Sequence, residues 1–246
     1  MKVTVVGYWH AFPEKGEAAS GYLLEQDHYR VLIDCGSGVV SQLQHYCKLD
    51  ELDAAVISHY HNDHIGDIGA LHYFRLLQPY ISDKTPNSFS IYGHQEDAEG
   101  FNNLSYKDIV QAYPYTPNQS LQLGPFTFTF YKTTHPVPCY AMKIETNGST
   151  LFYTADTGFT TELAEAAKGA DLLIAECSLY KGLDGSPAGH MNSVEAGRLA
   201  DMAGASSLLL THLPHFGEHS KLIDEAASIY NGPIDTASSG WSKILE

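Results

Sequence analysis

Residues 54–64 read AAVISHYHNDH, and this stretch decides how the whole chain is interpreted. Its first four residues are apolar and typical of a short buried strand, whereas its last seven bring three histidines and one aspartate into one loop. Gly66 and a helical pattern follow. Imidazole suits borderline cations such as zinc, and a neighbouring carboxylate can extend such a site to a second metal. The segment therefore predicts four metal ligands: His59, His61, Asp63 and His64.

The spacing HxHxDH is a specific signal. With 13 histidines among 246 residues, chance gives roughly 0.002 matches to this pattern in the whole chain. An ordinary polar loop is the alternative interpretation, and this frequency disfavours it.

Three more ligand-type residues each follow a predicted strand. They are His135 after residues 126–133, Asp156 after residues 150–154 and His212 after residues 207–211. Taken singly, each such residue is more often a surface or core residue, but the functional groups of α/β proteins gather at strand ends. We therefore predict all three as further ligands. His190 lies instead in a loop, before a helix that starts at Ser193.

Short apolar runs and helical patterns follow one another along the chain. The predicted strands are residues 2–7, 21–25, 30–34, 54–58, 89–92, 126–133, 141–145, 150–154, 172–176 and 207–211. The predicted helices are residues 38–46, 68–77, 160–167, 193–203 and 220–230. Asn147-Gly148 predicts a type I′ hairpin, and Asp27-His28 indicates a weaker turn. Because no linker or low-complexity tract separates these elements, we expect one α/β domain over residues 1–246.

Composition excludes several classes of partner. The formal net charge is −15 and no Lys/Arg-rich stretch occurs, which disfavours a long nucleic-acid duplex as partner. The N-terminal residues lack the apolar core of a signal peptide, and no stretch has the length of a membrane span, so we expect neither export nor membrane insertion. Four cysteines without CxxC spacing indicate reduced thiols and a cytoplasmic protein: Cys35, Cys47, Cys139 and Cys177.

The HxHxDH segment, followed by single His, Asp and His residues, resembles the metallo-β-lactamase superfamily over the whole chain. Within it, the chain resembles the ribonuclease Z-like branch. The segments that carry this narrower resemblance are Gly7-x-x-x-Ala11-x-Pro13, residues 32–36 (LIDCG), residues 155–157 (ADT) and residues 189–193 (GHMNS). The additional His190 is the most informative marker of the branch.

The resemblance implies a four-layer αββα sandwich of two mixed β-sheets, and it implies a dinuclear centre. One metal is expected to take His59, His61 and His135, the other Asp63, His64 and His212, with Asp156 bridging both. Zinc is the expected metal, with manganese or iron as alternatives. Two such cations can share a water, lower its pKa and hold it as hydroxide in line with a substrate.

The resemblance also assigns catalytic roles. His190 is expected to stabilise a phosphorane-like oxygen or to protonate the leaving group, against the alternative of a purely structural loop histidine. Asp63 is expected to orient or deprotonate the attacking water while it ligates metal. The chain is accordingly predicted to be a phosphodiesterase. The sequence does not predict its oligomeric state.

The tRNA-processing members of the branch carry a long Gly/Pro-rich arm between the motifs corresponding to His135 and Asp156. Here only 20 residues separate these positions, and they are predicted to form a short hairpin. A small phosphodiester is therefore the expected substrate and tRNA is disfavoured. Hydrolysis of a lactone or thioester is the alternative activity, and a non-catalytic metal-binding scaffold is a third possibility that the intact ligand set disfavours.

Several other residues are open to two interpretations. Trp9, His10 and Ser20 either border the substrate or have plain loop roles, and His215 and His219 either cover the site or are solvated; neither of these two histidines is assigned as a ligand. Residues 102–120, rich in Tyr, Pro and Asn, form either a substrate-facing lid or ordinary packing. His28, His45, His72 and His94 are expected to be structural.

Overall fold

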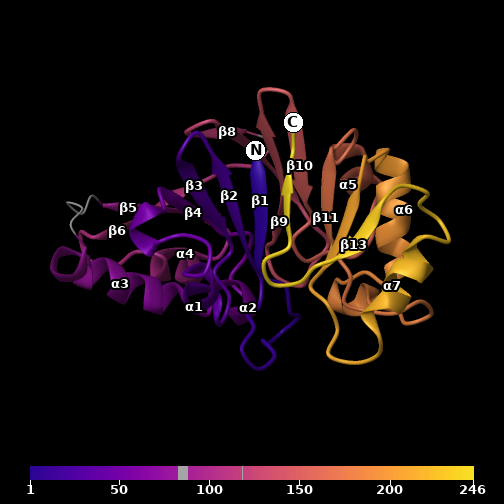
Figure 1. Ribbon diagram of the computed structural model, residues 1–246, viewed down its shortest axis with the longest axis horizontal. Helices are drawn as coiled ribbons and strands as arrows, with labels where there is room; N and C mark the ends of the chain where they lie inside the picture. The colour runs from indigo at the N-terminus through magenta and orange to yellow at the C-terminus, as the bar shows by residue number, and fades with distance from the viewer. Residues whose placement is uncertain (83–87, 118) are drawn as a thin grey trace. The chain divides into compact units, whose positions relative to one another are not determined.

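The computed structural model describes residues 1–82, 88–117 and 119–246 of the chain (Figure 1). These residues divide into two units, each with one mixed β-sheet. Unit 1 consists of Met1, Pro117–Ala237 and Ile244–Glu246, and unit 2 consists of Lys2–Thr116 and Ser238–Lys243. The four predicted ligands of the HxHxDH segment therefore belong to unit 2. The other three predicted ligands, His135, Asp156 and His212, belong to unit 1.

In the described part of unit 2, the sheet has seven strands in the order β14-β1-β2-β3-β4-β5-β6. Their bounds are β1 (Lys2–Gly7), β2 (Gly21–Gln26), β3 (Tyr29–Ile33), β4 (Ala54–Val56), β5 (Phe89–Gly93), β6 (Val110–Pro114) and β14 (Ser242–Ile244). The pairs β1–β2 and β2–β3 are antiparallel, whereas the neighbours from β3 to β6 are parallel. The parallel strands consequently end at one edge of the sheet, where the HxHxDH loop begins.

The helical elements of unit 2 are α1 (Val39–Leu43), η1 (Leu49–Glu51), α2 (Asn62–Ile65), α3 (Ile68–Ile81) and α4 (Ala98–Asn103). Buried side chains of the strands pack with residues of α1 and α3 in one hydrophobic core, which includes Leu32, Ile57 and Leu71. In Figure 1, α3 runs beneath β5 and β6.

The described part of unit 1 also has a seven-stranded sheet, in the order β13-β12-β11-β10-β9-β8-β7. Its strands are β7 (Ser120–Leu123), β8 (Phe126–Lys132), β9 (Tyr140–Thr146), β10 (Ser149–Tyr153), β11 (Leu172–Glu176), β12 (Leu208–Thr211) and β13 (Ile234–Thr236). The pairs from β7 to β10 are antiparallel and those from β10 to β13 are parallel. The predicted residues Asp156 and His212 follow two of the parallel strands.

The helical elements of unit 1 are α5 (Thr161–Ala166), η2 (Ser186–Ala188), α6 (Ser193–Ala203) and α7 (His219–Ala226). Helix α6 contacts β11, β12 and both other α-helices. Its start is fixed by a capping box: the Asn192 side chain accepts hydrogen bonds from the backbone N–H groups of Val194 and Glu195, and the Glu195 carboxylate accepts one from the Asn192 backbone N–H. The predicted range 193–203 is confirmed.

Both predicted turns are present, but one of them has a different turn type from the predicted one. The β9–β10 hairpin is present, with Thr146 opposite Ser149, but Asn147 does not have the positive φ that a type I′ turn requires, and only Gly148 does (φ 94°). The prediction of type I′ at Asn147-Gly148 is therefore wrong. In the β2–β3 turn, by contrast, Asp27 (φ 52°) and His28 (φ 66°) both have positive φ. Aspartate and histidine tolerate this left-handed conformation better than most residues.

The segment 102–120, considered above as a lid, contributes one strand to the sheet, although residue 118 lies outside the described residues. Residues 110–114 form β6, which pairs with β5. Tyr115 is only 5% exposed and its hydroxyl donates to the carbonyl oxygen of Ile57 at 2.9 Å. The aromatic residue at position 115 thus packs under the HxHxDH loop instead of covering a substrate.

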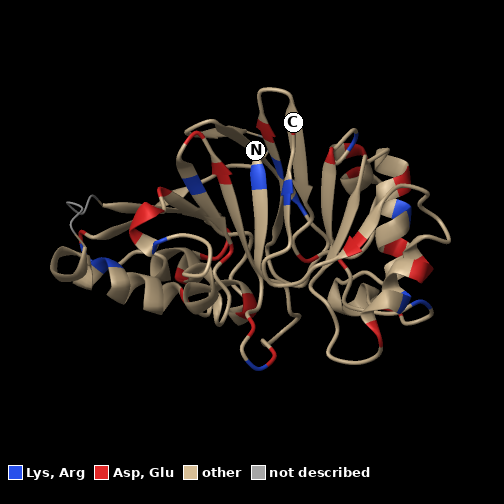
Figure 2. Ribbon diagram, in the orientation of Figure 1, with Lys and Arg blue, Asp and Glu red and all other residues tan. Residues whose placement is uncertain are grey.

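Acidic positions are spread over the elements of both units (Figure 2), in accord with the net charge of −15. Within the part of the chain that the structure describes, none of the helices combines the length and the apolarity of a membrane span.

Candidate metal centre

In unit 2, the HxHxDH loop leaves the carboxyl end of β4 and its last residues form α2. His59 is fully buried, and its Nε2 lies 3.2 Å from Nδ1 of His61. Two ring nitrogens that approach one another this closely are positioned to face a common cation. These two predicted ligands are therefore brought together within unit 2.

His64 is oriented by a buried carboxylate that the sequence analysis did not select. Asp34, which follows β3, accepts hydrogen bonds at 2.8 Å from the backbone N–H and the hydroxyl of Ser58, and its Oδ2 lies 2.8 Å from Nδ1 of His64. Because an ionised carboxylate only accepts, Nδ1 of His64 carries the hydrogen and Nε2 offers its lone pair. This Nε2 lies 3.8 Å from Oδ2 of Asp63.

Backbone contacts hold the same loop in place. The Asp63 carbonyl oxygen accepts from Ser20 N–H at 3.1 Å, and a Cβ on Gly36 would lie only 2.0 Å from that oxygen. Glycine at position 36 is therefore required by the close approach of the chain to the ligand loop. Ser20 is fully buried, with Oγ 3.4 Å from Nε2 of His64, so it lies beside a predicted ligand. Trp9 and His10 are half-buried in the first loop.

In unit 1, the carboxylate of Asp156 lies between two of the predicted histidines. Its Oδ2 is 3.9 Å from Nε2 of His135, and its Oδ1 is 3.5 Å from Nε2 of His212. His135 donates from Nδ1 to the carbonyl oxygen of Gly189 at 3.1 Å, so its Nε2 also offers a lone pair. Asp156 thus presents one oxygen toward each imidazole, as a carboxylate that bridges two cations does.

A second buried carboxylate, Glu176, connects His190 with His212. Its Oε1 lies 2.8 Å from Nδ1 of His190, while its Oε2 accepts from the Ser178 hydroxyl at 3.0 Å. The Ser178 oxygen in turn lies 2.9 Å from Nδ1 of His212. With the Ser178 hydrogen directed at Glu176, Nδ1 of His212 is the donor in that pair. Both histidines are therefore held in the tautomer with hydrogen on Nδ1.

Sequence reasoning missed Glu176, although one signal for it was present. The residue is the last of the predicted strand LLIAE at positions 172–176, where a charged residue ends a fully apolar run. It is completely buried, whereas the His190 side chain retains 12% exposure. A buried carboxylate that follows an apolar strand needs partners within the fold, and here the partner is the histidine that the resemblance singled out.

The donor sets fit divalent cations. His64, His135 and His212 each have Nδ1 bound to a carboxylate, carbonyl or hydroxyl oxygen, an arrangement that fixes metal-ligating imidazoles in general. Their Nε2 atoms lie 3.5–3.9 Å from carboxylate oxygens. These separations exceed a hydrogen bond but suit two ligands of one ion.

The cysteines and the histidines that are not predicted ligands lie in environments that do not suit metal binding. Burial raises the pKa of the Cys35 and Cys177 thiols well above the usual range, which keeps them protonated and disfavours them as ligands. The histidines interpreted as structural lie in local contacts of unit 2: Nε2 of His72 donates to Leu104, and His94 lies against the ring of Tyr60. Nε2 of His219, in unit 1, lies 2.9 Å from the Pro214 carbonyl oxygen.

Comparison with known proteins places the chain in a family. Residues 29–213 match the family model described as the beta-lactamase superfamily domain. The chain is 49% identical over 241 residues to "Probable metallo-hydrolase YhfI" of Bacillus subtilis, covering 98% of both proteins. It is also 22% identical to a ribonuclease Z of Methanopyrus kandleri over 92% of this chain and 91% of that one.

Solved structures show the same fold. The crystal structure of YhfI matches with a TM-score of 0.95 at 47% identity over 98% of both chains. A diphosphatase of the PhnP family matches with a TM-score of 0.78 at 18% identity, over 100% of this chain and 98% of the other, a likeness that concerns the fold alone. Two mixed seven-stranded sheets with flanking helices in the described residues confirm the predicted metallo-β-lactamase fold. The chain therefore belongs to the β-lactamase superfamily, as a metallo-hydrolase of its ribonuclease Z-like branch.

Proposed function

We propose that the protein is a dinuclear metal-dependent phosphodiesterase that acts on a small phosphodiester. In this proposal the ligand groups of the two units act together. One cation takes His59, His61 and His135, the other takes Asp63, His64 and His212, and Asp156 is shared by both. Zinc is the proposed metal, with manganese or iron as alternatives, because the donors are imidazoles and carboxylates.

When bound, the two cations would supply Lewis acidity and an activated water at neutral pH. The chain's own residues would hold the reacting groups in place. The carboxylate of Asp63 accepts a hydrogen bond at 2.9 Å from the backbone N–H of Ala11, which fixes its Oδ2. The proposed role of Asp63 is therefore to orient the attacking water as well as to bind metal.

The single observation that carries the proposal is the Glu176–His190 pair. Glu176 accepts the Nδ1 hydrogen of His190, so any proton that His190 gives or takes passes through Nε2. The rings of His190 and His212 have centroids 5.4 Å apart, and those of His190 and His135 are 5.3 Å apart. A proton donor beside two metal-ligand histidines suits the departure of an alkoxide or sugar oxygen from phosphorus.

A small substrate is favoured over tRNA by two features of the chain. The connection between His135 and Asp156 is occupied by the short β9–β10 hairpin and carries no additional arm. The net charge of −15 also disfavours an extended polyanion, although bound cations can attract a compact phosphate locally.

The first experiment measures bound metal and the hydrolysis of bis(p-nitrophenyl) phosphate. We expect about two metals per chain and loss of turnover on chelation. His190→Ala should keep its metal and lose about 10²- to 10⁴-fold in kcat, as expected for loss of a general acid. Asp156→Ala should lose both metal and activity, while His45→Ala, at an exposed turn position after α1, should match the wild type.

Two outcomes would contradict the proposal. A fully metallated wild type that opens lactones or thioesters but leaves phosphodiesters intact would replace it with carboxylic-ester chemistry. Unchanged phosphodiester turnover in His190→Ala would remove the assigned role of His190.

A further inference from the structure

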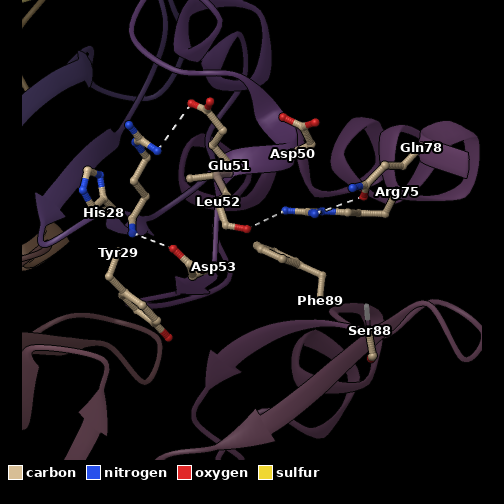
Figure 3. Close-up of a pocket in the computed structure, with 11 residues that line it drawn as sticks. His28, Tyr29, Asp50, Glu51, Leu52, Asp53, Arg75, Gln78, Ser88 and Phe89 are labelled. Carbon is tan, nitrogen blue, oxygen red and sulfur yellow. Dashed lines mark hydrogen bonds and ion pairs between the residues drawn. The ribbon is translucent and has the colours of Figure 1, made fainter. Parts of the chain in front are cut away.

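A cavity of about 550 Å³ lies in unit 2, away from the predicted metal ligands (Figure 3). Tyr29 and Phe89, which border it, are the first residues of β3 and β5, and Asp53 directly precedes β4. The strands β3, β4 and β5 are parallel neighbours in the sheet. The cavity therefore lies at their amino ends, whereas the HxHxDH loop leaves the carboxyl end of β4. It is accordingly separate from the candidate metal centre.

Arg75 of α3 is a buried cation on the wall of this cavity. Its side chain is only 5% exposed and extends from α3 toward Leu52 (Figure 3). The guanidinium donates to the carbonyl oxygens of Leu49 and Leu52 at 3.1 and 3.0 Å, and to the side-chain oxygen of Gln78 at 3.1 Å. These three acceptors are neutral, and Arg75 makes no ion pair within residues 1–82, 88–117 and 119–246. Buried charges are ordinarily paired with an opposite charge, so the environment of Arg75 is incomplete.

The same guanidinium also has a donor to spare. Its Nε is buried and has no hydrogen-bond acceptor in the described part of the chain. A buried donor without an acceptor is rare in folded proteins because it costs free energy. Burial lowers the pKa of Arg75 to about 10, which still leaves it charged at neutral pH. Arg75 therefore lacks a counter-charge, and the cavity beside it is the space from which a ligand can supply one.

A carboxylate on the same cavity is in the complementary situation. Asp53 is exposed, its Oδ2 accepts the backbone N–H of Arg30 at 2.8 Å, and it makes no ion pair with any residue that the structure describes. The guanidinium of Arg30, by contrast, is paired with Glu25 and Glu51. The charge of Asp53 opposes the effect of burial on the pKa of Arg75. Asp53 and Arg75 are therefore near enough to attract one another, although they form no ion pair.

Two opposite charges without ion pairs on one cavity fit a ligand that carries both charges. A carboxylate of the ligand would lie against Arg75, since guanidinium groups suit planar carboxylates, and an ammonium group would lie against Asp53. A ligand with negative charge alone would be repelled, because Asp50 and Glu51 line the cavity as well. A ligand with positive charge alone would leave Arg75 without a counter-charge.

The size and the walls of the cavity fit an amino acid. Its volume lies within the ordinary range of small-molecule sites and exceeds what one metal ion or one small inorganic ion needs. The rings of Tyr29 and Phe89 offer apolar surface to the remainder of the ligand. Phe89 is itself held in place by Arg75, whose guanidinium lies 4.0 Å from the centroid of its ring.

We propose that this cavity binds a small zwitterion of the amino-acid class, with the ligand carboxylate on Arg75 and the ligand ammonium group on Asp53. The inference does not rest on the proposed chemistry, because none of the described residues that line the cavity is a predicted metal ligand.

Isothermal titration calorimetry on the purified protein tests the proposal, with each of the standard free amino acids as the probe. At least one of them should bind with a dissociation constant below about 1 mM. Asp53→Asn should raise that constant by about 10-fold or more, because it removes the charge that faces the ammonium group. Asp224→Asn is the matched control: it removes the same charge at an exposed position of α7, and the affinity should be unchanged.

The charges of the ligand are tested by removing one of them at a time. The N-acetyl and the carboxamide derivatives of the amino acid that binds should each bind at least about 10-fold more weakly. The carboxamide tests the contact with Arg75 without a substitution of this buried residue. Such a substitution would also leave the Leu49 and Leu52 carbonyl oxygens without their donors.

Three results would overturn the proposal. The first is a wild type that binds none of the amino acids with a dissociation constant below about 1 mM. The second is an affinity that is the same in Asp53→Asn as in the wild type, which is also what an amino acid bound at the metal centre would give. The third is a derivative with a single charge that binds as tightly as the parent amino acid.

Discussion

Glu176 is a single buried carboxylate that positions two histidine side chains, His190 directly and His212 through Ser178. We predict that Glu176→Gln keeps its bound metal but lowers kcat about 10- to 100-fold, because an amide fixes the His190 tautomer and its charge less well. Metal analysis and a pH–rate profile check this, and the alkaline limb of the profile, where a general acid loses its proton, should shift relative to the wild type. Glu165→Gln, on the exposed side of α5, is the matched control.

A Glu176→Gln variant with wild-type kcat and an unshifted pH profile would show that the carboxylate has only a packing role. Loss of bound metal in the same variant would instead show that Glu176 acts mainly through His212.

Residue by residue, the predictable part of the site was the part with a local signal. HxHxDH has a fixed spacing, and His135, Asp156 and His212 each follow an apolar run. Asp34 and Glu176 were missed because each is one carboxylate at the end of a strand, and its partner is distant in sequence: Asp34 orients His64, 30 residues away, and Glu176 orients His190, 14 residues away. Motif spacing in the sequence does not predict contacts between residues that only the fold brings together.

At the scale of elements, helix α6 begins only three residues after His190, and its capping box sets where the loop that carries His190 ends. We predict that Asn192→Ala costs about 1 kcal/mol of unfolding free energy and also lowers kcat. The matched control is Thr160→Ala at the N-terminus of α5, where the hydroxyl accepts from Leu163 N–H at 3.1 Å. It should cost a similar free energy and leave kcat unchanged. Urea unfolding and steady-state kinetics on both variants test this. If Asn192→Ala and Thr160→Ala have the same kcat, the cap of α6 does not affect the site.

Long, apolar elements were predictable and short, polar ones were not. The strand at 172–176 and the helix at 193–203 were predicted with their observed bounds. The strands β6, β7, β13 and β14 were missed because their sequences, VQAYP, SLQL, IDT and SKI, are short and contain at most two aliphatic residues each, so that they become strands only by pairing with a neighbour. Helix α3 was predicted to end at Leu77 but continues to Ile81, with Pro79 inside it.

For the whole molecule, burial of all four cysteines has a measurable consequence. Burial raises the pKa of Cys47 to about 11 and those of Cys35 and Cys177 well above the usual range. Because the thiolate is the reactive form, we predict almost no reaction of the native protein with a disulfide reagent such as Ellman's at pH 8. Four thiols per chain should react after unfolding in guanidinium chloride. Rapid reaction of even one thiol in the native protein would show that its burial is transient.

The prediction of one domain over residues 1–246 remains a prediction, because the described residues divide into two units. The fold class was nevertheless predictable, because it depends on the order of strands and helices along the chain. The grouping of residues into units was not predictable, because it depends on contacts between segments that are distant in sequence.

The hydrogen bond between Glu176 and His190 closes a loop of the chain, and the backbone N–H of Ser193 closes it again by donating to the Leu179 carbonyl oxygen at 2.9 Å. A loop clamped at both ends can gain or lose residues at small entropic cost, since closure entropy grows only slowly with length. We therefore expect that insertions or deletions between residues 180 and 184 leave the sheet and α6 intact.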